Sequence, residues 1–143
     1  MTRACRLSLF VVFAVLSVVA CSKSSSTSPS LPTAAFSATD LVVGTGATAA
    51  NGSRVSVGYT GWLYDPSRPE NKGSQFDSGT IQPFVLGSGT LIRGFEQGIV
   101  GMRVGGSRRV VIPPDLGYGS AGRPPQIPGN ATLVFDITLV SVQ

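Results

Sequence analysis

Histidine is missing from this chain of 143 residues, and cysteine occurs only at positions 5 and 21. Without histidine the chain cannot form a Ser-His-Asp or Cys-His nucleophilic site, nor a His-based metal site. The seven acidic residues are well separated in sequence, and no two show the spacing of metal ligands or of an acid–base pair. Any reaction catalysed here must therefore proceed without a nucleophile or a metal, and we expect no cofactor.

Basic residues are also few, and they are scattered along the chain. The formal net charge is +4, but Arg3 and Arg6 lie before the apolar run at residues 7–20. Without these two, the chain carries 9 basic and 7 acidic residues. A nucleic-acid surface needs clustered Lys and Arg with interleaved aromatic residues. The only adjacent pair is Arg108 and Arg109, which we interpret as strand residues with their side chains in water. The sequence thus predicts no nucleic-acid partner.

The N-terminal segment has the features of a secretory signal. Two arginines precede an almost entirely apolar run at residues 7–20, which is 14 residues long and so shorter than the ~20 residues of a membrane-spanning helix. A basic start, a short apolar run and a small residue before a boundary are typical of a signal peptide. We therefore assign residues 1–20 to a signal peptide.

The boundary at Cys21 suggests a lipid anchor. The sequence VVAC at 18–21 resembles the bacterial lipobox, in which a small residue precedes the cysteine that is acylated. The resemblance implies lipidation at Cys21 and an extracytoplasmic, membrane-anchored protein, in either the inner or the outer membrane if the host is Gram-negative. The alternative is an ordinary signal peptide with a chance cysteine at its end.

Two further regions follow this boundary. Residues 21–39 are rich in Ser, Thr and Pro, a composition that cannot bury enough apolar surface to fold, and we expect a flexible tether. From residue 40 to residue 143, short β-type runs at 41–43, 54–63, 84–86, 110–112 and 132–142 alternate with glycine- and proline-rich turns. Only 92–100 has a helical pattern. One short helix with an antiparallel sheet predicts a single α+β domain.

Seven segments of this domain occur in an order and spacing that resemble the FKBP family of peptidyl-prolyl isomerases. They are VGYTG at 57–61, QFDS at 75–78, FVLG at 84–87, LIRGFEQG at 91–98, GMRVGG at 101–106, IPPDLGYG at 112–119 and IPGNATLVF at 127–135. The resemblance covers essentially all of residues 40–143. It implies an antiparallel β half-barrel wrapped around one short α-helix, with an apolar cleft between them.

The resemblance also implies the residues of the cleft. Ile92 is expected to offer its backbone N–H, and Tyr118 its hydroxyl, to substrate carbonyls. Phe95 is expected to form the floor, where the best-known members carry tryptophan, and Asp77 to be the one charged group nearby. The catalytic set is Tyr59, Asp77, Ile92, Tyr118 and Phe135, and the substrate-binding set is Phe76, Phe84, Leu91, Phe95 and Ile127.

Pattern alone leaves several of these positions open. Tyr59 and Phe135 fall on strand faces where core residues belong, and Asp77 before Ser78 and a glycine is typical of a turn. The segment after Asp77 is shorter than in many members of the family. The aromatic position that usually lines the pocket there falls to Ile81, Gln82 or Phe84.

The activity implied is acceleration of X-Pro bond rotation in exported proteins. This reaction makes and breaks no covalent bond, so it needs none of the groups that the chain lacks. The alternative is a module or chaperone that binds proline-containing segments with negligible turnover. Either function implies proline-containing polypeptides as partners. The resemblance further implies binding of rapamycin-like macrolides, and we expect the protein to act as a monomer.

Overall fold

The computed structural model describes residues 30–143, so the predicted signal peptide and Cys21 lie outside the described residues. Five strands form one antiparallel sheet in this part of the chain: β1 (Ser37–Val42), β2 (Arg54–Tyr64), β3 (Lys72–Val85), β4 (Ser107–Ile112) and β5 (Leu133–Val142). Their order across the sheet is β1-β4-β5-β2-β3. The single α-helix is α1 (Arg93–Ile99), and short 3-10 turns occur at Pro69–Asn71 and Pro114–Leu116. No helix in this range is long and apolar enough to cross a membrane.

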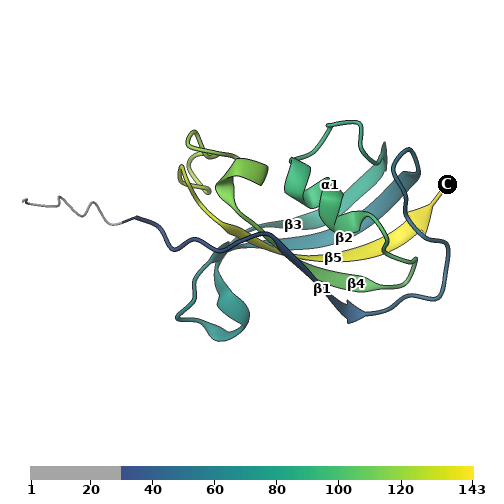
Figure 1. The fold of residues 1–143 in the computed structure, drawn as a ribbon, viewed down its shortest axis with the longest axis horizontal. Coiled ribbons are helices and arrows are strands. Elements are labelled where there is room, and N and C mark those ends of the chain that lie inside the picture. Colours follow the sequence, from purple (N-terminus) through teal and green to yellow (C-terminus); the bar gives the residue numbers. More distant parts are fainter. Residues whose placement is uncertain (1–29) are drawn as a thin grey trace, which may run out of the picture.

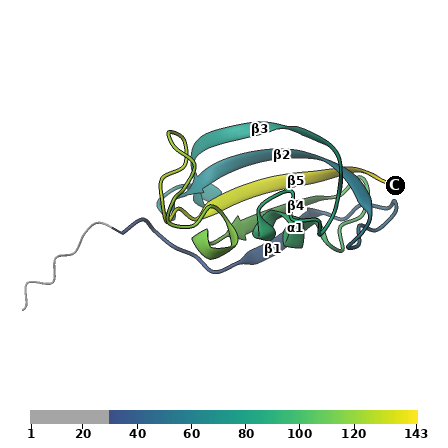
Figure 2. The ribbon, with the colours of Figure 1, turned by 90° about the horizontal axis from the view of Figure 1, so that it is seen from above.

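The sheet curves around α1, which lies against its concave face (Figures 1 and 2). Alternation along the strands sends one set of side chains to this face. In β5, Leu133, Phe135, Ile137 and Leu139 are buried, whereas Asp136 and Thr138 point outward. The core is completed from β2, β4 and α1. The predicted α+β half-barrel with one short helix is confirmed.

A seven-residue helix is too short to be stable by itself, so its packing against the sheet must hold it. Gly98 permits the close approach that this packing needs. A Cβ atom at Gly98 would lie 2.5 Å from Cγ2 of Val110 on β4. The glycine therefore allows α1 to rest directly on the strand, and this contact fixes the height of the helix above the sheet.

Both edge strands are longer than the sequence predicted. β1 begins at Ser37, inside the stretch assigned to the tether, and β3 has 14 residues where only a run at 84–86 was expected. Both are edge strands with mostly exposed side chains, so their backbone pairing leaves no apolar pattern in the sequence. Pro83 within β3 also weakens the strand signal, although an edge strand tolerates proline because one side of its backbone is unpaired.

The expectation that Arg108 and Arg109 point into water is wrong. Arg108 donates to the Asp40 carboxylate at 2.6 Å and to the carbonyl of Gly98 at 2.9 Å. It thereby ties β1 and the C-terminal end of α1 to β4, where a cation is favourable.

Arg109 belongs to an ion-pair group on the outer face of the sheet. It donates to both carboxylate oxygens of Asp136, at 2.8 and 3.0 Å, and Lys72 donates to the same carboxylate at 2.7 Å. Burial alone would raise the pKa of Asp136, but these hydrogen bonds and charges outweigh it and hold the pKa below its usual value. Side chains from β3, β5 and β4 thus meet on the convex surface and brace it across the intervening strand β2.

Candidate active site

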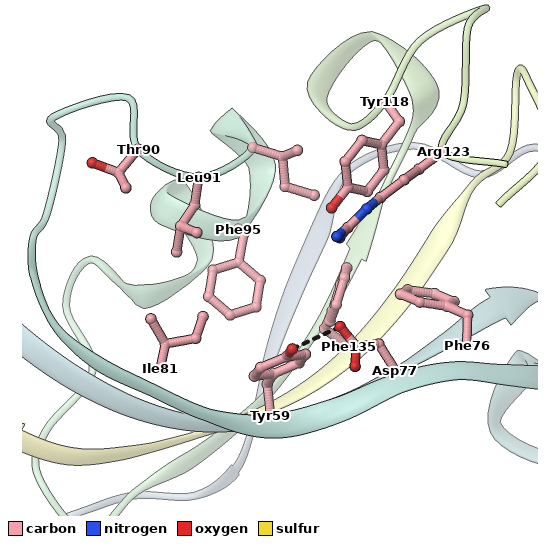
Figure 3. A pocket seen from close by; sticks show the side chains of 11 residues that line it. Tyr59, Phe76, Asp77, Ile81, Thr90, Leu91, Phe95, Tyr118, Arg123 and Phe135 are labelled. Carbon is pink, nitrogen blue, oxygen red and sulfur yellow. Dashed lines mark hydrogen bonds between the residues drawn. The ribbon is translucent and has the colours of Figure 1, made fainter. Parts of the chain in front are cut away.

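A cavity of about 270 Å³ opens between α1 and the concave face of the sheet. Its walls come from strands β2, β3 and β5, from the segment that leads into α1, and from the long loop between β4 and β5 (Figure 3). The residues that line it are Tyr59, Phe76, Asp77, Ile81, Thr90, Leu91, Ile92, Phe95, Tyr118, Arg123 and Phe135.

Four aromatic rings form the inner wall of the cavity, and Phe135 lies at their centre. Its ring centroid is 5.2 Å from that of Phe95, 5.5 Å from that of Phe76 and 6.2 Å from that of Tyr59. The first two pairs are T-shaped, and so is the pair of Tyr59 with Phe95 at 5.9 Å. Edge-to-face contacts at this separation are favourable beyond the apolar area that they bury. The rings therefore support one another as a fixed surface.

The strand position behind these rings must be glycine. Gly61 on β2 pairs with Phe135 on β5 and with Asp77 on β3. A Cβ atom at Gly61 would lie 2.6 Å from the ring of Phe76 and 2.7 Å from the ring of Phe135. The absence of a side chain lets both rings approach the backbone of β2 at this position.

Tyr59 and Asp77 form the polar pair at the edge of this aromatic wall. The Tyr59 hydroxyl donates to Oδ2 of Asp77 at 2.7 Å, and Oδ1 accepts the backbone N–H of Ser78 at 2.9 Å (Figure 3). Burial, followed by this hydrogen bond, raises the pKa of Tyr59 to about 12. Tyr59 therefore stays protonated at physiological pH and keeps the carboxylate in one orientation.

Among the hydrogen-bond donors at the cavity, the two that were predicted to bind substrate carbonyls have no acceptor within residues 30–143. They are the backbone N–H of Ile92 and the hydroxyl of Tyr118. Ile92 precedes the first turn of α1, where leading N–H groups have no partner inside the helix. Both donors are therefore unpaired in the described part of the chain.

The Ile92 donor is positioned by a buried carboxylate. Glu96 on α1 is 7% exposed, and it accepts the backbone N–H groups of Gly87 at 2.9 Å and Leu91 at 3.0 Å. These bonds bind the segment between β3 and α1 to the helix. Thr90, Leu91 and Ile92 therefore present a defined wall rather than a free loop.

Eight of the ten predicted site residues line the cavity, and Phe84 and Ile127 do not. Phe84 is 9% exposed and packs in the hydrophobic core, opposite Val55 of β2. Its assignment as a substrate-binding residue was wrong, because Ile81 lines the cavity instead. Phe84 pairs with Val55 and Ile81 with Val57, and a register irregularity lies between these two pairs. Ile127 is 2% exposed and borders an adjoining cavity instead.

Arg123 is a second charged group of the cavity and Thr90 also lines it, and neither was among the predicted site residues. Asp77 is therefore not the one charged group near the cleft. Arg123 lies in a loop with little secondary structure, where no periodicity reports the direction of a side chain. Within residues 30–143, no group of three or more acidic side chains is arranged to hold a metal ion.

The half-barrel combines an aromatic cavity with two free donors, an arrangement that suits an apolar, carbonyl-containing ligand. The profile of the FKBP-type peptidyl-prolyl cis-trans isomerases matches residues 46–140. The chain belongs to this family.

Individual relatives agree with the family match. The chain is 47% identical to "FK506-binding protein 4" of Dictyostelium discoideum over 104 residues, which are 71% of this chain and 27% of that protein. It is 46% identical to the murine "Peptidyl-prolyl cis-trans isomerase FKBP2" over 96 residues, 64% of each chain. The chain thus spans about a quarter of the length of the first curated relatives that it matches.

A solved structure shows the same fold. The crystal structure of a peptidyl-prolyl cis-trans isomerase from Pseudomonas syringae pv. tomato superposes with a TM-score of 0.63 at 34% identity. The comparison covers 82% of this chain and 84% of that one.

Proposed function

We propose that the protein accelerates rotation about X-Pro peptide bonds in exported polypeptides. The observation that carries this proposal is the pair of unpartnered donors, Ile92 N–H and Tyr118 hydroxyl, facing an aromatic cavity. Membership of the family supports the same activity. Uncatalysed rotation takes tens to hundreds of seconds, which is slow enough to limit folding.

The geometry suits this reaction. The planar amide owes its barrier of ~20 kcal/mol to resonance that separates charge between oxygen and nitrogen. The rings of Phe95, Phe135 and Tyr59 provide an apolar surface that disfavours this charge separation relative to the twisted amide. The two donors can fix the flanking carbonyls so that binding is tightest in the twisted geometry. Asp77, held by Tyr59, contributes an oriented negative charge at the rim.

An exchange experiment by NMR on an X-Pro peptide, with no protease present, tests the activity. We expect the purified full-length chain in detergent to accelerate exchange, and Tyr118→Phe to lower kcat/KM by about fivefold, since one hydrogen bond contributes about 1 kcal/mol. Tyr64→Phe removes a phenol outside the cavity and should keep full activity. Binding of the peptide without acceleration, or full activity of a Tyr118→Phe, Asp77→Ala, Phe135→Ala triple variant, would refute this catalytic role.

We further propose that Cys21 carries lipid and anchors the protein to a membrane outside the cytoplasm. The support is the sequence alone: the apolar run at 7–20, the VVAC boundary and the polar tether that follows. Cys21→Ala should move the protein from the membrane fraction to the soluble fraction, and mass spectrometry should show loss of the acyl chains. Cys5→Ala is the matched control and should stay anchored. Retention of Cys21→Ala in the membrane fraction would exclude the lipid anchor.

The same cavity is proposed to accept rapamycin-like macrolides. Five of the relatives are named FK506-binding proteins. The aromatic walls of the cavity offer an apolar surface for a ligand of this kind. Phe95 keeps the apolar floor of the cavity.

A further inference from the structure

A second, more polar cavity of about 170 Å³ adjoins the aromatic one. The two share Phe76, Asp77 and Arg123, and the second is completed by Gln126 and Ile127. Because they share three lining residues, a peptide in the aromatic cavity can extend into the polar one without leaving the surface. Arg123 is the only cation among the lining residues of either cavity.

The backbone of Arg123 is firmly held although its side chain is exposed. Arg123 and Ile127 form an isolated antiparallel bridge, with N–H to carbonyl distances of 2.8 and 3.0 Å in the two directions. Ile127 is buried in the core and anchors this small loop. The side chain of Arg123 projects beside Tyr118 toward the cavity that contains Tyr59 and Asp77 (Figure 3).

The guanidinium of Arg123 has no carboxylate partner in the described part of the chain. Within residues 30–143, the guanidinium forms no ion pair and no side-chain hydrogen bond, whereas Lys72, Arg108 and Arg109 each have a carboxylate partner. Asp77 lines both cavities with Arg123, but the two side chains form no ion pair, and the Asp77 oxygens accept the Tyr59 hydroxyl and the Ser78 N–H. A guanidinium offers five N–H donors in a planar fork that matches a carboxylate. An anion supplied by the ligand is the partner that this group lacks.

We infer that Arg123, with Gln126 beside it, forms a subsite for an acidic side chain of the substrate, located directly before or after the proline. This inference rests on the proposed isomerase function and specifies which substrates it selects. The two cavities share a wall, and one residue of extended peptide spans roughly 3.5 Å. With the proline in the aromatic cavity, a neighbouring residue of the substrate therefore reaches the polar one. A carboxylate there gains a charge-assisted hydrogen bond, which a neutral amide of equal size does not.

Peptides that differ in a single side chain test the subsite. A series carries Glu, Gln or Lys at the position before or after the proline, with everything else unchanged, and exchange spectra give kcat/KM for each. At low salt we expect the full-length protein to favour Glu over Gln by about twofold to fivefold at one of the two positions, the range typical of exposed ion pairs. Lys should be the poorest at that position, and 0.5 M NaCl should shrink the preference by screening.

Variants then assign the preference to Arg123. Arg123→Gln should bring the Glu-to-Gln ratio to about one, and Arg123→Glu should invert it in favour of Lys. Arg54→Gln removes the same charge from an exposed position outside both cavities and should preserve the ratio. A ratio of one for the unaltered protein at both positions, or an equal loss of preference in Arg54→Gln, would overturn the subsite.

The proposed function and the subsite fail in different ways. If no peptide is isomerised, the isomerase proposal fails, but chemical-shift titrations of the same peptides still give the ratio of dissociation constants for Glu and Gln. A Kd preference for Glu that disappears in Arg123→Gln supports the subsite even then. If peptides are isomerised with no discrimination in kcat/KM or Kd, the activity stands and the subsite is wrong.

Discussion

Replacement of Phe135 by alanine is expected to damage both stability and activity. The ring is 4% exposed and contacts Tyr59, Phe76 and Phe95. Truncation of a buried phenylalanine costs about 3–5 kcal/mol, from lost burial and from the cavity that is left. Because three other rings lose their common support, we expect kcat/KM per folded molecule to fall at least about tenfold, which is 1.4 kcal/mol in the barrier. Urea denaturation and NMR exchange measure the two effects.

A core variant on the same strand separates these two effects. Leu139 is fully buried in β5 and lies outside the cavity, and Leu139→Ala should cost about 2–5 kcal/mol. Its folded molecules should keep the activity of the unaltered protein. Phe135→Leu retains most of the volume but no ring, so it should be more stable than Phe135→Ala and still have weakened turnover. If Leu139→Ala loses as much activity per folded molecule as Phe135→Ala, Phe135 acts through general stability and not through the aromatic wall.

The sequence predicted those parts of the fold in which burial of one face produces an alternation of apolar and polar residues. β5 alternates apolar and polar residues because one face covers the core, and its interior positions were identified correctly. The edge strands β1 and β3 bury little, so their residues follow no such alternation. Their pairing depends on backbone groups that every residue has, and the sequence could not report it. Ser37, Ala38 and Thr39 were therefore placed in the tether.

The site divides in a similar way. Its residues on strands and at the start of α1 could be placed from ordered motifs, because regular elements fix the side to which each residue points. Phe84 and Ile81 both face inward near a register irregularity, and only the three-dimensional packing decides which of them lines the cavity. The ionic partners of Arg108 and Arg109 are distant in sequence, so charge composition could not identify them.

Replacement of Glu96 by alanine is expected to loosen the wall of the cavity, although Glu96 does not line the cavity itself. Its carboxylate accepts N–H groups of Gly87 and Leu91 at 2.9 and 3.0 Å, with a longer contact to Gly89 at 3.4 Å. Hydrogen bonds to a charged acceptor contribute about 1.5–3 kcal/mol, and donors left without an acceptor add a desolvation cost. We therefore expect a loss of about 3 kcal/mol in unfolding free energy, together with a higher KM because Leu91 and Ile92 are no longer held.

Hydrogen exchange distinguishes this positioning role from a general loss of stability. In Glu96→Ala the amides of Gly87 and Leu91 should exchange much faster under conditions where the rest of the fold stays protected, since only the local segment opens. Glu96→Gln keeps one acceptor oxygen but turns an amide group toward an N–H donor, so its effect should be intermediate. Gln97→Ala, at the exposed neighbouring position, should leave both exchange and KM unchanged. Unchanged protection at Leu91 in a variant with reduced activity would show that Glu96 acts by another route than holding the loop.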